Sequence, residues 1–213
     1  MKLTLTFDNG PDPEVTPRVL DLLARHGMRA WFFVLGKHLE EEAGRALVKR
    51  ALAEGHLVGN HSYSHEIPLG DDPRADAVEK EIATTQRQLE ALVPGERIFR
   101  PFGGGGVLGP HLLSRSARDH LCAERFDCVL WNSVPGDWIE GHDWVASAKR
   151  DLETQSHALM VLHDISGACI EELGGFLDHV ARSEVEVVLD FPTEQVPIRG
   201  GEVVADLEPL VRA

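Results

Sequence analysis

The sequence predicts an α/β fold built around a mostly parallel sheet, and the main observation is a strand–helix alternation repeated along 213 residues. Runs 31–34 and 159–162 are continuously apolar, as in strands that are covered on both faces. Right-handed crossovers would join such strands. The pattern alone leaves two closures open, an open doubly wound sheet and a barrel.

The expected elements follow from hydrophobic periodicity and stop signals. The expected strands are the short apolar or β-branched runs 2–7, 29–34, 57–59, 97–99, 128–131, 159–163 and 186–189. The expected helices are the amphipathic stretches 14–25, 38–54, 74–92, 111–123, 143–154 and 169–182. Gly27 and Gly55 follow the first two helices, where glycine commonly ends a helix.

The length of 213 residues suits a single domain with a sizeable core. No internal repeat, linker or low-complexity tract marks a second domain. A Pro197…Gly200-Gly201 break precedes the last apolar run. We therefore expect one catalytic domain over 1–192, with 193–213 as a peripheral hairpin or tail.

Composition excludes several classes of function. The net charge is −14 and no basic stripe appears, which argues against a nucleic-acid partner. No run approaches the roughly 20 apolar residues that a membrane-spanning helix needs. The three cysteines, Cys122, Cys128 and Cys169, have no CxxC spacing, so we expect free thiols rather than disulfides or a thiolate metal site. The sequence gives no information on the oligomeric state.

The amino terminus alternates over residues 1–7 and has no basic region that leads into a long apolar run. This pattern is typical of a strand rather than a signal peptide. As the sequence stands, the expected location is cytoplasmic; a removed leader would make it extracytoplasmic.

Titratable side chains follow several of the expected strands directly. In parallel α/β folds the carboxyl ends of strands carry the chemistry, so these residues are expected to assemble one site. The residues at these positions are Asp8, Asn9, His61, His65, Arg100, Asp137 and His163.

The pair His61 and His65 is the strongest single feature. Two histidines four residues apart would share a face on one helical turn and could reach one ion. The alternative is two unrelated surface histidines in a chain that has eleven. A carboxamide or carboxylate at the end of strand 2–7 would complete three ligands. Zinc, cobalt, nickel or iron suits such nitrogen and oxygen donors.

Asp8 and His163 each allow two interpretations. Asp8 precedes a turn-forming Asn9-Gly10-Pro11 and is either an Asx-turn residue or a general base beside a metal-bound water. His163 at a strand end is either structural or a participant in the same site. Residues alone leave both alternatives open.

Five ordered motifs resemble those of the polysaccharide deacetylases, the NodB-homology carbohydrate esterases of family four. They are Thr6-Phe7-Asp8-Asn9-Gly10-Pro11, His61-Ser62-Tyr63-Ser64-His65, Arg100-Pro101, Asp137-Trp138 and Leu162-His163. The resemblance spans residues 4 to 164 and implies a distorted (β/α)7-type barrel in a single domain. It also implies a metal-dependent hydrolase that removes N-acetyl groups from an N-acetylated sugar polymer or oligomer.

The resemblance assigns roles position by position. Asp8 matches the catalytic base and His163 the acid that protonates the leaving amine. Asp137 matches the partner that tunes this histidine, and Arg100 the arginine that orients the base. The remaining matches are metal ligands at Asn9, His61 and His65, and substrate contacts at Trp138, Phe102 and Gly103. The implied cofactor is one divalent transition metal, zinc first, with cobalt or nickel as alternatives.

This sequence departs from the family pattern in three places. Asn9 replaces a second aspartate that is normally a metal ligand, so we expect weaker metal affinity and a more electrophilic ion. Gly103–Gly106 extends the arginine motif, either to face an oxyanion or as a flexible connector. Asn132 and Val134 stand where a further aspartate is common. Two other functions therefore stay open: hydrolysis of another small C–N amide, and a sugar-binding pseudoenzyme.

Overall fold

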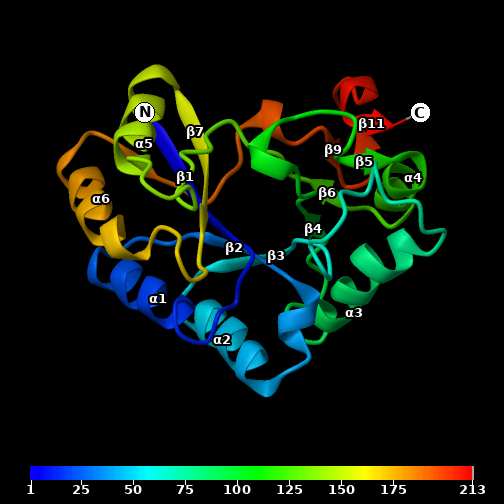
Figure 1. Ribbon diagram of the computed structural model, residues 1–213, viewed down its shortest axis with the longest axis horizontal. Helices are drawn as coiled ribbons and strands as arrows, with labels where there is room; N and C mark the ends of the chain where they lie inside the picture. The colour runs from blue at the N-terminus through cyan, green and yellow to red at the C-terminus, as the bar shows by residue number, and fades with distance from the viewer. Residues whose placement is uncertain (213) are drawn as a thin grey trace. The chain divides into compact units, whose positions relative to one another are not determined.

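The computed structural model describes residues 1–212, and its ribbon is drawn in Figure 1. The chain divides into two compact units, each assembled from separate segments. Unit 1 contains residues 1–33, 38–58 and 131–192; unit 2 contains residues 34–37, 59–130 and the segment from Thr193 onward. A break falls at the expected boundary after residue 192, and the segment from Thr193 onward groups with residues 59–130; the expected division into a catalytic domain and a tail stays a prediction.

Unit 1 is built on strand β1 (Lys2–Asp8), whose side chains from Leu3 onward are all buried. β7 (His157–His163) pairs with it in parallel over its whole length. β2 (Trp31–Val34) pairs in parallel with its carboxyl end and β8 (Glu186–Val187) with its amino end. The expected parallel sheet is confirmed here, and burial on both faces explains the apolar runs.

Four helices belong to unit 1: α1 (Thr16–Arg25), α2 (Glu42–Ala53), α5 (Trp144–Thr154) and α6 (Ile170–Arg182). α1 and α6 lie side by side (Figure 1) and each turns an apolar face inward. Two ion pairs join them at their surface, Arg18–Glu171 at 3.0 Å and His26–Asp178 at 2.9 Å. Exposed pairs of this kind contribute little, so apolar packing stabilises the contact.

Unit 2 contains a short parallel ladder. β3 (Leu57–Asn60) pairs with β4 (Ile98–Phe99), and β4 pairs with β6 (Asp127–Cys128). The expected terminal hairpin forms from β9 (Ile198–Arg199) and β10 (Glu202–Val203), and β9 extends the ladder by antiparallel pairing with β6. A second parallel pair joins β5 (Leu113–Ser114) to β11 (Val211–Arg212).

The helices of unit 2 are α3 (Thr84–Glu90) and α4 (Arg115–Ala123). α4 starts later than expected because Leu113 and Ser114 enter a strand, and the Ser114 side chain then caps the helix by accepting from the Ala117 N–H. Single 3₁₀ turns occupy Gly104–Gly106, Thr193–Gln195 and Glu208–Leu210.

The prediction of one helix over 38–54 is wrong. A 3₁₀ turn covers Gly36–Leu39, and α2 begins only at Glu42. The Arg45 Nη1 donates to the carbonyls of Leu39 and Glu40 at 2.7 and 2.6 Å. A side chain therefore satisfies carbonyls that a continuous helix would have bonded through its own backbone.

The prediction of one helix over 74–92 is also wrong. Regular helix covers only α3, and a π-helical turn, Glu79–Ala83, precedes it. Arg74 lies before these helical turns and binds the Asp72 carboxylate at 2.5 Å. π turns are uncommon and often occur at functional sites, so the contacts of this one are described below.

The three cysteines are free thiols, as expected; Cys128 and Cys169 are buried and Cys122 is partly exposed. Across residues 1–212, no helix combines the length and the apolar character that a membrane crossing requires.

Candidate active site

Asp8 and His163 end neighbouring parallel strands at the same level. Asp8 is the last residue of β1 and His163 the last of β7, and the two are partners in the strand register. Both side chains are largely buried. Because the ladder fixes both backbones, a carboxylate and an imidazole are held next to each other at the carboxyl edge of the sheet.

Asp137 orients His163 through two hydrogen bonds. The His163 Nδ1–H donates to Asp137 Oδ1 at 2.9 Å, and the His163 backbone N–H donates to Oδ2 at 2.8 Å. With Nδ1 protonated, the ring exchanges its other proton at Nε2. The predicted pairing of Asp137 with His163 is therefore present in the structure.

The environment of His163 favours its protonated form. Burial lowers its pKa, but the hydrogen bond and charge of Asp137, together with the charges of Asp8 and Asp164, outweigh burial and raise the pKa above its ordinary value. A histidine whose protonated form is favoured is suited to give a proton away.

Trp138 packs edge-on against His163, with 4.8 Å between ring centroids and 79° between ring planes. Its side chain is also among the exposed large apolar groups. One part of the indole therefore fixes the imidazole while another faces solvent, which is compatible with the predicted substrate contact.

Asp164 is a buried carboxyl that directly follows His163 and to which the sequence analysis assigned no role. Its Oδ2 accepts from the Thr16 hydroxyl at 2.5 Å, and its Oδ1 has no partner within residues 1–212. Gly10 leaves it room, because a Cβ at that position would overlap the carboxyl group. Burial raises the pKa of Asp164 to about 7. Its position directly after a strand end was the only signal in the sequence.

Replacing Asp164 with asparagine should flatten the pH dependence of stability. The folded state holds this proton up to about pH 7, whereas the ordinary pKa is 3.8. Between these values the unfolded state binds fewer protons, so wild-type stability falls as pH rises, by up to about 1.4 kcal/mol per pH unit.

Urea unfolding of wild type and Asp164→Asn from pH 4 to pH 8 measures this effect. We expect the difference in unfolding free energy to move in favour of the variant as pH rises and to level off above about pH 7. Parallel pH curves would show that Asp164 loses its proton at an ordinary pKa.

The histidine motif lies in unit 2, in the loop after β3. The expectation that His61 and His65 share one helical turn is wrong: the loop is irregular, and Ser62 and His65 have φ angles of 71° and 59°. The loop nevertheless brings the two rings together, with centroids 5.1 Å apart. Residues in the left-handed region turn the backbone tightly. The loop therefore places the two imidazole rings close together, as the spacing of a helical turn was expected to do.

His61 has a defined tautomer. Its Nδ1–H donates to the Arg100 carbonyl at 2.9 Å, because a carbonyl oxygen can only accept. The lone pair is then on Nε2, the arrangement found in metal-ligating histidines whose other nitrogen is bound by a backbone carbonyl. His61 therefore fits a metal ligand.

Phe102 contacts a histidine rather than open solvent. Its ring stacks on His65 with 3.9 Å between centroids and 26° between planes. The role predicted for Phe102 was a substrate contact, and the structure adds a packing role that holds His65. A Cβ at Gly103 would lie 2.5 Å from a Leu112 methyl group, so a larger residue there would require the Leu112 side chain to shift; the predicted substrate contact of Gly103 stays a prediction.

Arg100 is fully buried, and within unit 2 its Nη2 donates to the Leu130 carbonyl at 3.2 Å. Its backbone N–H bonds the Asn60 carbonyl at 2.9 Å, which continues the ladder of β3 and β4. Arg100 was predicted to orient the base, Asp8, and this role stays a prediction. Gly104 and Gly105 have open space around their α-carbons, which agrees with either interpretation of the glycine run.

Asn9 follows β1 with φ 76°, a conformation that asparagine tolerates better than most residues. Its backbone N–H bonds the Phe33 carbonyl at 3.2 Å. Its side-chain Oδ1 is buried and accepts no hydrogen bond from residues 1–212. A buried amide oxygen without a donor is destabilising by about 1–3 kcal/mol, so its presence favours a ligand role.

An amide oxygen and two imidazole nitrogens, the donor types of the predicted ligands Asn9, His61 and His65, are types that divalent transition metals accept; that these residues form one ligand set stays a prediction. Among residues 1–212, no three His, Cys, Asp or Glu side chains gather into a metal group. The predicted set contains only two residues of these types, because Asn9 provides an amide in place of a carboxylate.

The chain is similar to known proteins over most of its length. A family model described as "Polysaccharide deacetylase" matches residues 1–107. A chitooligosaccharide deacetylase of Rhizobium leguminosarum bv. phaseoli is 33% identical over 189 residues, covering 88% of this chain and 77% of that protein. The peptidoglycan-N-acetylglucosamine deacetylase PgdA of Listeria monocytogenes serotype 1/2a is 46% identical over 165 residues, which are 77% of this chain and 32% of PgdA.

Solved structures extend the likeness to the fold. Peptidoglycan deacetylase PdaC from Bacillus subtilis matches with a TM-score of 0.69 at 26% identity, covering 88% of this chain and 86% of PdaC. A family 4 acetyl xylan esterase from Clostridium thermocellum, in complex with a cobalt ion, matches with a TM-score of 0.70 at 26% identity, covering 88% and 87%. Enzymes of this group generally depend on a metal. Motifs, fold and relatives agree: the chain belongs to the polysaccharide deacetylase family.

Proposed function

We propose that this protein removes acetyl groups from N-acetylglucosamine units of a sugar oligomer or polymer. The observation that carries the proposal is the pairing of Asp8 with His163 at neighbouring strand ends, with Asp137 holding the imidazole. The relatives that support it are named for chitooligosaccharide and for peptidoglycan N-acetylglucosamine.

The chemistry divides between a base and an acid. Asp8 takes a proton from the water that attacks the acetyl carbonyl, and His163 gives its Nε2 proton to the nitrogen as the C–N bond breaks. The products are acetate and the free amine, so one water is consumed for each acetyl group released. Asp137 stabilises the imidazolium before transfer and keeps the ring in the required tautomer.

A divalent metal, when bound, would lower the pKa of a water molecule and polarise the carbonyl. The family motifs assign its ligands as one amide oxygen and two imidazole nitrogens, those of Asn9, His61 and His65. We propose zinc as the first choice, with cobalt and nickel as alternatives, because all three accept this donor set.

Acetate release from N-acetylglucosamine oligomers and from peptidoglycan tests the function. Deacetylation of either substrate by the metal-loaded protein is expected. Turnover of small formyl or cyclic amides without turnover of the sugars would favour the other amide hydrolase. Binding of oligomers without release of acetate would favour the pseudoenzyme.

Restoring a carboxylate with Asn9→Asp should tighten metal binding. The substitution replaces a neutral amide ligand with an anionic one, so the dissociation constant for zinc should fall. Competition with a chelator of known affinity measures it. An unchanged dissociation constant would remove residue 9 from the ligand set.

A further inference from the structure

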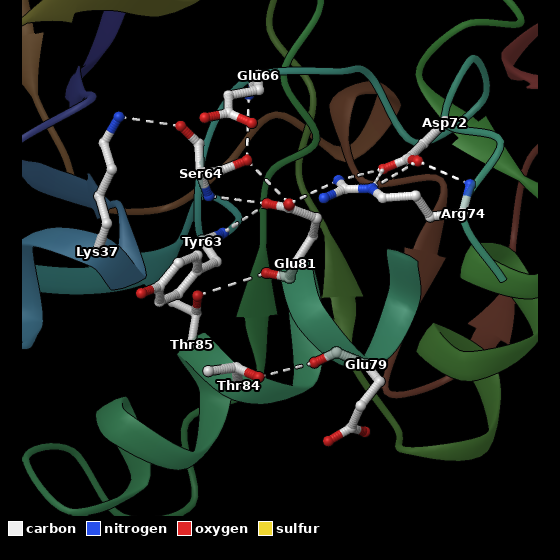
Figure 2. Close-up of polar contacts among 10 residues, drawn as sticks. All are labelled: Lys37, Tyr63, Ser64, Glu66, Asp72, Arg74, Glu79, Glu81, Thr84 and Thr85. Atoms are coloured by element: carbon white, nitrogen blue, oxygen red, sulfur yellow. Dashed lines mark hydrogen bonds and ion pairs between the residues drawn. The ribbon is translucent and has the colours of Figure 1, made fainter. Parts of the chain in front are cut away.

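Glu81 is a buried carboxylate that the proposed chemistry does not use. It lies in the π-helical turn Glu79–Ala83 and is 1% exposed. Figure 2 shows its side chain pointing from the helix toward Tyr63 and Ser64, which lie between His61 and His65 in the sequence. A buried carboxylate is stable only when several donors satisfy it, so its partners indicate its role.

Four hydrogen bonds reach the two oxygens of Glu81. Oε2 accepts from the backbone N–H groups of Tyr63 and Ser64 at 3.1 and 2.8 Å. Oε1 accepts from the Ser64 hydroxyl at 2.8 Å and from Arg74 Nη2 at 3.0 Å. Three of the four donors therefore belong to the stretch between the two histidines (Figure 2).

Arg74 supplies a positive charge beside the Glu81 carboxylate. It bridges the Glu81 carboxylate and the Asp72 carboxylate, whose side chain is fully buried. The guanidinium holds the pKa of Asp72 below its ordinary range, mainly through their hydrogen bond. The carboxylate of Glu81 is thus held in place from the side opposite the loop (Figure 2).

The loop needs such support because its backbone is in a sparsely populated conformation. Ser62 and His65, on either side of the Glu81 contacts, have φ angles of 71° and 59°. Residues other than glycine keep such angles only where the surroundings hold them. The Asn60 side chain accepts from the Ser62 N–H at 3.0 Å, and Lys37 Nζ donates to the Ser64 carbonyl at 3.0 Å.

We propose that Glu81 is a positioning residue that holds the loop so that His61 and His65 are arranged for a metal before it binds. The proposal rests on the proposed function, because that function is the reason for a metal site. The contacts that support it all lie within unit 2. Ligands fixed in advance lose less conformational freedom on binding, and the groups that orient them commonly change metal affinity by about 10- to 100-fold.

Glu81→Gln is the sharp test because it preserves shape. A carboxylate has two acceptor oxygens and a carboxamide has one. Whichever way the new amide turns, its NH₂ group faces either two backbone N–H groups or the Ser64 hydroxyl and Arg74. The variant must therefore lose the acceptor either for the two backbone N–H groups or for Arg74, whereas the Ser64 hydroxyl can turn to accept from the amide.

Glu79→Gln is the matched control. It removes the same charge from the same π turn, but the Glu79 side chain is 65% exposed and pairs with Arg87 on the surface. Cobalt is the probe, because its visible absorption reports binding to nitrogen and oxygen ligands. Titration of metal-free wild type, Glu81→Gln and Glu79→Gln gives three dissociation constants.

We expect cobalt to bind Glu81→Gln about 10- to 100-fold more weakly than wild type, and Glu79→Gln like wild type. At saturating cobalt the kcat of Glu81→Gln should return toward the wild-type value, since no ligand is lost. Equal affinity in the two variants, or a lowered kcat that cobalt fails to restore, would overturn the proposal.

Amide hydrogen exchange of the metal-free proteins gives a readout independent of metal and turnover. Exchange at Tyr63 and Ser64 should be faster in Glu81→Gln than in wild type and Glu79→Gln, while exchange in β1 and β7 stays unchanged. Unchanged exchange at Tyr63 and Ser64 would refute the positioning role. A wild-type protein that neither binds cobalt nor releases acetate would refute the proposed function instead.

Discussion

Replacing Asp8 with asparagine is expected to lower kcat by about 10²- to 10⁴-fold, the usual contribution of a general base. An amide has nearly the same shape but cannot take up a proton from water at neutral pH. Asp8 is buried at the end of β1, in register with His163, and its charge helps to raise the pKa of that histidine. The variant should therefore lower the pKa of His163, and with it the protonated fraction of the acid, as well as remove the base.

Acetate release at saturating substrate measures kcat, and elemental analysis measures bound metal. Metal content should stay at the wild-type level, because Asp8 is not among the proposed ligands. Asp21→Asn on α1 is the control, with a side chain 59% exposed. An Asp8→Asn variant with near-normal kcat would exclude Asp8 as the base.

His61→Ala should abolish metal binding and, with it, turnover. The wild type is expected to carry about one equivalent of transition metal, and two of three ligands cannot hold it in competition with water and buffer. His61 is a strong candidate for a metal ligand because its Nδ1–H is hydrogen-bonded to the Arg100 carbonyl. Nε2 is then the ring nitrogen that can bind a metal.

Elemental analysis before and after dialysis against a chelator measures this loss. His179→Ala, on α6 in the other unit, removes an imidazole without touching the motif and should leave the metal content unchanged. Full retention of metal by His61→Ala would place the ion elsewhere and would require another ligand set.

The parts of the site that could be predicted from sequence are those set by local pattern. Asp8 and His163 each follow a buried apolar run, so their place at strand ends could be inferred before the strands were seen to pair. The family resemblance then proposed Asp137 as a partner, and the structure shows the hydrogen bonds. Periodicity found the helices that pack their apolar faces, such as α1 and α6.

Contacts between distant residues were not predictable in this way. Glu81 looked like an ordinary helix residue, because a single sequence does not show that its carboxylate binds a backbone 17 residues away. The prediction of regular helix over 74–92 overlooked the π turn for the same reason. The behaviour of Asp164 was not predictable either, since its raised pKa comes from burial that only the fold creates.

The unpaired thiols offer a way to follow the opening of each unit separately. Cys169 lies in unit 1 and Cys128 in unit 2, and burial raises the pKa of both thiols, to about 12 for Cys128. Thiolates are the reactive form, so an alkylating reagent should modify Cys122 first and reach the other two only when their surroundings unfold. Mass spectrometry of alkylated peptides over time would then compare the local stability of the two units in unlabelled wild-type protein.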